Sequence, residues 1–127
     1  MVNTLNKTAP NIIIPSTLDE KFELKKLKSK FIVIYFYPKD NTPGCTIETK
    51  DFNSLLSQFK KLNCDIIGIS KDNIESHIKF SGKYKIKFDL VADTNLEAIK
   101  AYKVWGKKKF MGREFMGLIR STFLLKN

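Results

Sequence analysis

The sequence predicts an α/β domain in which a mainly parallel β-sheet is covered by helices on both faces and an antiparallel hairpin comes last. Residues 31–37 (FIVIYFY) and 65–70 (DIIGIS) are largely apolar runs, which are typical of strands buried on both faces of a sheet. Segments with helical periodicity or helix-start signals separate the strand-like runs, and this alternation favours parallel pairing. The length of 127 residues suits one domain, residues 1–127.

The elements can be taken in order along the chain. Residues 11–14 form a short strand that ends at Pro15, and residues 22–24 are a second candidate strand, followed by a lysine-rich turn or short helix. Residues 31–37 then form the central strand. After a turn, apolar residues recur at helical spacing, which predicts a helix over residues 45–62.

The second half of the chain continues the alternation. Asp72 with Glu75, and Thr94 with Glu97, have the spacing of a capping box and indicate two helix starts. A hairpin ends the chain, with its turn at residues 116–117. The predicted elements are a strand over residues 65–70, a helix over 73–84, a strand over 88–92, a helix over 96–102, and hairpin strands over 110–115 and 118–125.

Composition excludes several classes of protein. The net charge of +10 comes from 23 basic and 13 acidic residues, but the lysines are scattered and no helix-turn-helix, zinc knuckle or RNA-binding aromatic motif accompanies them. They indicate a solvated basic surface, so nucleic-acid binding is disfavoured. No apolar run is long enough to span a membrane, and the N-terminus lacks a secretory signal. We therefore expect a cytoplasmic location, where thiols stay reduced.

Cys45 stands just inside the predicted helix that follows the central strand. The thiolate is the nucleophilic form of cysteine, and the unpaired N–H groups and the dipole of a first helical turn stabilise negative charge. Pro38 and Pro43 restrict the preceding loop, and Gly44 permits a backbone approach that a Cβ would obstruct. Position alone leaves two interpretations open, a reactive thiolate or a small buried apolar side chain.

The loop resembles a known family. The residues Pro38, Thr42 and Cys45 match the PxxxTxxC signature of the peroxiredoxins, and YFYPKDNTPGCTIE resembles the branch called bacterioferritin comigratory protein or peroxiredoxin Q. Further similarities follow in order over nearly the whole chain, at residues 9–10, 68–70, 77–84, 102–105 and 120–123. The resemblance implies a thioredoxin-like fold and a thiol-dependent peroxidase acting on hydrogen peroxide and organic hydroperoxides, without a cofactor. One histidine and two cysteines cannot form a typical four-ligand zinc site, so no metal is expected.

The resemblance also implies a role for each site residue. Cys45 would be the peroxidatic cysteine, Thr42 would hydrogen-bond the peroxide, and Pro38 would shield the sulfur. Arg120 would polarise the peroxide, with Glu48 orienting it. Arg120 lies in an apolar segment (LIRSTFLL), where an unpaired charge would be costly to bury, and Cys45 with Glu48 would provide its anionic partner. Alternatively, Thr42 is only a cap and Glu48 an ordinary first-turn carboxylate.

The sequence departs from this branch in its second cysteine. Many members carry a resolving cysteine five residues after the first, where this chain has Lys50, and the helix predicted over residues 73–84 contains none. About 17 helical residues would separate Cys45 from Cys64 by roughly 25 Å, whereas a disulfide needs Cα atoms within about 7 Å. We expect Cys64 to be a structural thiol, and an external thiol such as thioredoxin or a small thiol to reduce Cys45. Reduction by Cys64 of another chain is the less favoured route.

Four further expectations complete the interpretation. The family would continue past residue 127 into another strand and a C-terminal helix, so their absence would leave part of the sheet open. A monomer or weak dimer is expected, and His77 and Trp105 are expected to be structural or surface residues. The segment Cys45 to Glu48 lacks the CxxC of a disulfide oxidoreductase, which leaves a non-enzymatic redox sensor or binding protein as the alternative.

Overall fold

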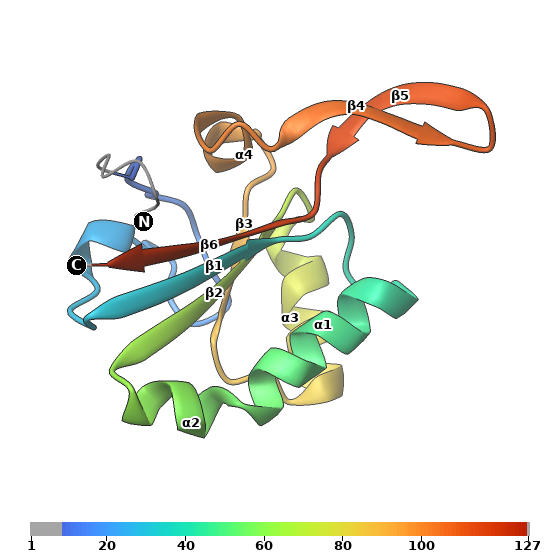
Figure 1. Cartoon of the computed structure of the whole chain (residues 1–127). Helices are drawn as coiled ribbons and strands as arrows, with labels where there is room; N and C mark the ends of the chain where they lie inside the picture. The colour runs from blue at the N-terminus through green and yellow to red at the C-terminus, as the bar shows by residue number, and fades with distance from the viewer. Residues whose placement is uncertain (1–8, 127) are drawn as a thin grey trace.

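The computed structural model describes residues 9–126 and is built around a four-stranded mixed sheet. The strands are β1 (Phe31–Phe36), β2 (Cys64–Ser70), β3 (Asp89–Ala92) and β6 (Ser121–Lys126), in the order β3-β2-β1-β6. The first three are parallel, and β6 runs antiparallel to β1 (Figure 1). The predicted α/β class, a mixed central sheet flanked by helices, is confirmed.

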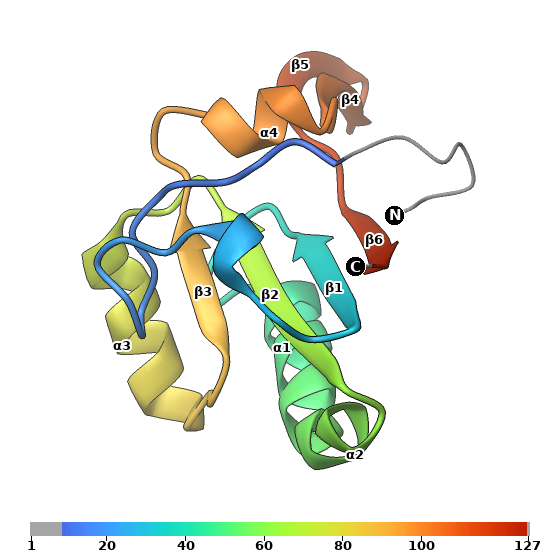
Figure 2. The same cartoon turned by 90° about the vertical axis from the view of Figure 1, so that its left-hand side faces the viewer.

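Helices cover both faces of this sheet. Helices α1 (Pro43–Ser54), α2 (Leu56–Lys61) and α3 (Ile74–Tyr84) lie on one face, and α4 (Glu97–Ala101) with the short 3-10 helix η1 (Leu24–Lys26) lies on the other (Figures 1 and 2). Successive residues of β1 enter different apolar clusters because side chains alternate along a strand. Ile32, Ile34 and Phe36 pack on the α4 side, whereas Val33 and Tyr35 pack under α1 and α3. This double coverage explains why β1 has no polar alternation.

Two short N-terminal strands were predicted, and the structure reduces them to one bridge. Ile13 pairs with Glu23, supported by backbone hydrogen bonds from Ile14 to Phe22 and from Leu24 to Ile12. The segment then turns into η1, so of the two predicted possibilities, a lysine-rich turn or a short helix, the structure has the short helix.

The prediction of one long helix over residues 45–62 is wrong, because the structure has two helices there. Helix α1 ends at Ser54 and α2 begins at Leu56, with Leu55 between them at φ −95° and ψ 0°. The hydroxyl of Ser54 donates to the carbonyl of Asp51 at 2.9 Å and so competes for a helical acceptor. The break turns the chain back toward the start of β2.

The C-terminal hairpin exists, but its register was predicted wrongly. Its strands are β4 (Trp105–Phe110) and β5 (Arg113–Leu118), which form a separate two-stranded sheet beside α4 (Figure 1). The turn lies at Met111 and Gly112, both with positive φ, as a tight two-residue hairpin turn requires, rather than at residues 116–117. Strand β6 therefore leaves the hairpin and pairs with β1 instead.

The helix starts also use other residues than predicted. Helix α3 is capped by Asn73, whose side chain accepts from the N–H of Ser76 at 2.8 Å. Helix α4 starts after Leu96, and the buried carboxylate of Asp93 accepts from the N–H of Ile99 at 2.7 Å. Within residues 9–126, no helix is long and apolar enough to cross a membrane.

Candidate active site

Cys45 lies where the chain leaves the sheet and enters α1. The helix begins at Pro43, with Thr42 as the N-cap, so Cys45 is in the first helical turn and is only 1 % exposed. The unpaired N–H groups of that turn and the helix dipole favour negative charge at this position. The expectation that Gly44 avoids a steric clash is wrong, because a Cβ there would lie 3.5 Å from Nη2 of Arg120, an ordinary contact distance.

Arg120 joins Cys45 and Glu48. Its Nη2 donates to Sγ of Cys45 at 3.1 Å, and its Nη1 donates to Oε1 of Glu48 at 2.5 Å. Glu48 is three residues after Cys45 and so lies on the same face of α1. Arg120 itself does not lie in a strand, as the apolar pattern suggested, but in the link between β5 and β6, and its side chain is 41 % exposed.

The electrostatics of this triad favour a charged guanidinium. Partial burial lowers the pKa of Arg120, but the hydrogen bond to Cys45 and the charge of Glu48 outweigh it, so the pKa is raised overall. Burial raises the pKa of Glu48, and the adjacent Arg120 opposes that rise. Both pKa values are raised, but by different causes: loss of water raises the pKa of Glu48, whereas the hydrogen bonds and charges of Cys45 and Glu48 raise that of Arg120.

An open groove of about 510 Å³ runs along α1 beside this triad. Its lining residues are Gly44, Ile47, Glu48, Asp51, Phe52, Leu55 and Arg120. Apolar side chains dominate its surface, and Arg120 is its only cation. A ligand with a polar end near Arg120 and an apolar remainder matches this lining.

The other two predicted site residues lie in the loop that leads to Cys45. Thr42 is half-buried, and its hydroxyl donates to the carbonyl of Lys39 at 2.9 Å. Pro38 is also half-buried and directly follows the fully buried Tyr37. Neither Pro38 nor Thr42 is among the groove-lining residues.

A buried contact beneath Cys45 fixes α1 on the sheet. The hydroxyls of Tyr35 and Thr49 are 2.9 Å apart, and both residues are fully buried. The ring of Tyr35 also stacks on Phe52, with 4.7 Å between ring centroids. Burial raises the pKa of Tyr35, so its hydroxyl stays protonated and able to donate.

Comparison with known proteins identifies the family. Residues 5–127 match the AhpC/TSA family over almost the whole chain. The chain belongs to the AhpC/TSA family. A putative peroxiredoxin bcp from Helicobacter pylori is 43 % identical over 121 residues, which cover 95 % of this chain and 80 % of that protein.

Solved structures agree with this assignment. Peroxiredoxin Q of Xanthomonas campestris superposes with a TM-score of 0.84 at 40 % identity, covering 91 % of this chain and 73 % of that one. Yeast mitochondrial 1-Cys peroxiredoxin superposes with a TM-score of 0.83 at 28 % identity, covering 99 % of this chain and 63 % of that one. The resemblance to the Bcp and peroxiredoxin Q branch, the thioredoxin-like fold and the activity of a thiol-dependent peroxidase are confirmed.

The second cysteine of this peroxiredoxin lies at the other end of the sheet. Cys64 begins β2 and pairs in register with Phe31, the first residue of β1, whereas Cys45 follows the last. Five residues of strand rise separate these ends by roughly 16 Å, well beyond the reach of a disulfide. Both thiols are free and buried, and burial raises the pKa of the Cys64 thiol. The continuous helix on which the predicted separation rested was wrong, and the argument now rests on the opposite ends of β1.

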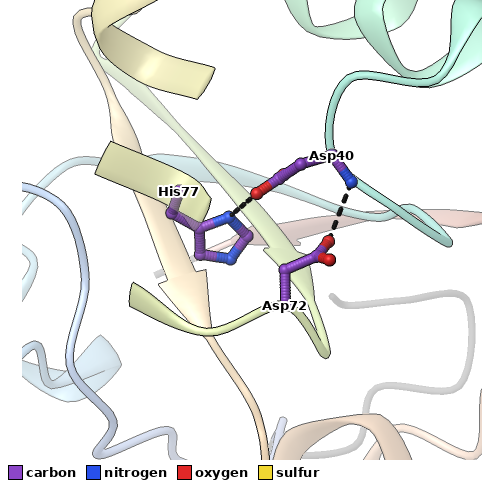
Figure 3. Close-up of side chains that lie close together, drawn as sticks. All are labelled: Asp40, Asp72 and His77. Carbon is purple, nitrogen blue, oxygen red and sulfur yellow. Dashed lines mark hydrogen bonds and ion pairs between the residues drawn. The ribbon is translucent and has the colours of Figure 1, made fainter. Parts of the chain in front are cut away.

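Sequence reasoning missed a polar cluster behind the loop. Asp40, Asp72 and His77 bring their side-chain ligand atoms within 4.8 Å of one another (Figure 3). His77 is fully buried, so it is a structural residue and not a surface one. The signal available in the sequence was Asp40 itself, an acidic residue in the short loop between the central strand and Cys45.

Proposed function

We propose that this peroxiredoxin reduces peroxides through Cys45, which cycles through a sulfenic acid and is reduced by an external thiol. The observation that supports it most directly is the 3.1 Å contact between Nη2 of Arg120 and Sγ of Cys45. It pairs a nucleophile at a helix N-terminus with a permanent cation, and Glu48 holds that cation in place.

The first step oxidises the sulfur. The thiolate of Cys45 attacks one oxygen of the peroxide, so an S–O bond forms as the O–O bond breaks. The second oxygen leaves with the electron pair of that bond and takes up a proton to become water or an alcohol. The sulfur is left as a sulfenic acid, and two electrons have passed from sulfur to the peroxide.

Arg120 stabilises the charge that moves during this step. Negative charge starts on sulfur and develops on the departing oxygen, so a fixed donor beside both atoms lowers the barrier. The hydroxyl of Thr42, which donates its hydrogen to the carbonyl of Lys39, accepts a hydrogen bond from the O–H of the peroxide. Pro38 limits the access of water to the sulfur. Glu48 orients Arg120 and does not touch the peroxide.

The groove supports organic hydroperoxides as substrates besides hydrogen peroxide. Ile47, Phe52 and Leu55 line it next to Gly44 and Arg120, which flank Cys45. An alkyl or aryl group attached to the peroxide can therefore lie on apolar side chains while its O–O bond reaches the sulfur.

The second step restores the thiol. An external thiol attacks the sulfenic sulfur, water leaves, and a mixed disulfide forms; a second thiol then releases Cys45 as a disulfide product separates. The position of Cys64 at the far end of the sheet supports this route over an internal disulfide. The yeast relative is described by a thiol resolving mechanism through glutathione and thioredoxin systems, which supports reductants of the same kind here.

Intact-mass measurement after one equivalent of hydrogen peroxide, with a sulfenic-acid trap, tests this proposal on wild type, Cys45→Ser and Cys64→Ser. We expect trapping at Cys45 in wild type and in Cys64→Ser, none in Cys45→Ser, and renewed trapping after dithiothreitol and more peroxide. A single round of oxidation that dithiothreitol does not reset would favour the redox-sensor alternative. Unselective oxidation of both thiols would refute the assignment of Cys45.

A further inference from the structure

We propose that Asp40 and His77 form a buried latch that fixes the loop before Cys45 against α3 and so positions the reactive sulfur. This inference rests on the proposed function, because it concerns how Cys45 is held for reaction. Its evidence is separate from the triad, since the hydrogen bonds of Asp40 and His77 go to other residues and neither residue lines the groove.

The latch is made by side chains from three elements. Oδ2 of Asp40 lies 2.7 Å from Nδ1 of His77 on α3 and accepts from the hydroxyl of Ser76 at 2.8 Å. Oδ1 accepts from the hydroxyl of Tyr37, at the end of β1, at 2.6 Å. The side chains of His77 and Asp40 are 0 % and 3 % exposed, so water does not compete for these contacts.

The loop backbone is tied down as well. The N–H of Asp40 donates to Oδ2 of Asp72 at 2.8 Å, in the connection between β2 and α3 (Figure 3). Asn41, the next residue, has positive φ and accepts from the hydroxyl of Tyr84 at 3.3 Å, near the end of α3. Two successive loop residues are thus bound to both ends of one helix, five and four positions before Cys45.

Donor and acceptor chemistry shows why a histidine is needed. Nε2 of His77 lies 2.9 Å from the carbonyl of Val91 on β3, which can only accept, so Nε2 carries a proton. On the opposite side of the ring Nδ1 faces a carboxylate. The two ring nitrogens of His77 thus bond partners on different elements, and the imidazole links β3 to the loop through α3.

The same geometry argues against a metal ion in this cluster. Both ring nitrogens of His77 already have protein partners, and Oδ2 of Asp72 accepts from the hydroxyl of Ser70 at 2.7 Å as well as from the loop. Asp40 thus bonds both other residues, His77 through its carboxylate and Asp72 through its N–H. Their arrangement holds the backbone of the loop before Cys45 in place.

Two disruptive variants test the latch. His77→Gln has only one donor nitrogen in its side chain, and that nitrogen cannot take the places of both ring nitrogens beside Asp40 and Val91. Asp40→Ala removes the carboxylate from the loop without a change in α3. In both variants we expect Cys45 to react with hydrogen peroxide about tenfold to a hundredfold more slowly, the loss expected when a reacting group is misplaced by about 1 Å. The second-order rate constant for oxidation of Cys45 is obtained by quenching the reaction at set times and measuring the intact mass.

The rate of alkylation by iodoacetamide is a second measurement, and it distinguishes positioning of Cys45 from a general contribution of Asp40 and His77 to stability. Loss of the latch frees the loop, so Cys45 should alkylate about tenfold faster by local opening while Cys64 keeps its wild-type rate. Global destabilisation would accelerate both cysteines. Ile99→Val, a buried truncation on the α4 side of the sheet, is the matched control and should change neither rate selectively.

A conservative variant completes the test. In Asp40→Asn, the amide oxygen can accept from Tyr37 while its NH2 donates to Nδ1 of a neutral His77, so most of the oxidation rate should return. The latch is refuted if His77→Gln and Asp40→Ala oxidise at the wild-type rate, or if both cysteines alkylate faster together. If wild-type Cys45 is not oxidised selectively, the peroxidatic role of Cys45 fails, and selective alkylation still decides whether the latch exists.

Discussion

Replacing Arg120 by methionine is the sharpest perturbation of the proposed mechanism. Methionine keeps much of the unbranched apolar stem and removes the two contacts, 3.1 Å to Sγ of Cys45 and 2.5 Å to Oε1 of Glu48. The expected result is slower oxidation of Cys45 with an intact fold, because the side chain is 41 % exposed and contributes little to the core.

The size of the effect follows from the contacts. Removal of one preorganised donor from a dry active site lowers rates by roughly a hundredfold to a thousandfold. Water reaches Arg120, and exposed charges are screened, so we place the loss for Arg120→Met at the lower end, about a hundredfold. Arg120→Lys should lose about tenfold, because an ammonium keeps the charge but not the planar fork that reaches Cys45 and Glu48 together.

The assay is the second-order rate of Cys45 oxidation at low and high salt, with Arg113→Met as the control. Arg113 is the other arginine, on the exposed hairpin strand β5, and its substitution should leave the rate unchanged. The wild-type rate should fall with salt, and that of Arg120→Met should not. A rate for Arg120→Met within threefold of wild type, with retained fold, would refute the electrostatic role.

Three other predictions concern packing, pH and substrate choice. Gly68→Ala should lower the free energy of unfolding by about 1–3 kcal/mol, because its Cβ would lie 2.7 Å from the hydroxyl of the fully buried Tyr35. Denaturant titration measures this change, and a loss below about 0.5 kcal/mol, the range of neutral substitutions, would contradict the prediction. Burial raises the pKa of Tyr102 to about 12, above its value of about 10 in the unfolded chain, so its contribution to stability is complete below pH 10 and is lost as pH rises toward 12. Tyr102→Phe, which loses the 2.7 Å hydrogen bond to the carbonyl of Pro10, should be less stable at pH 7 and decline less steeply above pH 10; parallel curves would contradict the assignment. Leu55→Glu, at the groove, should slow the reaction with cumene hydroperoxide more than that with hydrogen peroxide, and equal slowing would show that the groove does not bind the organic group.

The main strands and helices could be predicted from the sequence because their signals are local. The apolar run that became β1 and the helical spacing of apolar residues after Cys45 each depend on neighbours within a few positions. The break at Leu55 escaped prediction because it depends on how α2 must return to β2. The hairpin register escaped because Gly112 and Gly117 are both plausible turn residues, and only the pairing of β6 with β1 decides between them.

The sequence by itself determined the α/β class, the family and the placement of Cys45 in a first helical turn, since each depends on residue type and spacing along the chain. Only the tertiary structure decided the surroundings of that cysteine. Arg120 reaches Cys45 across 75 positions, and His77 reaches Asp40 across 37. Such contacts depend on the order of strands in the sheet and on which helix covers which face, and local periodicity carries no information about either.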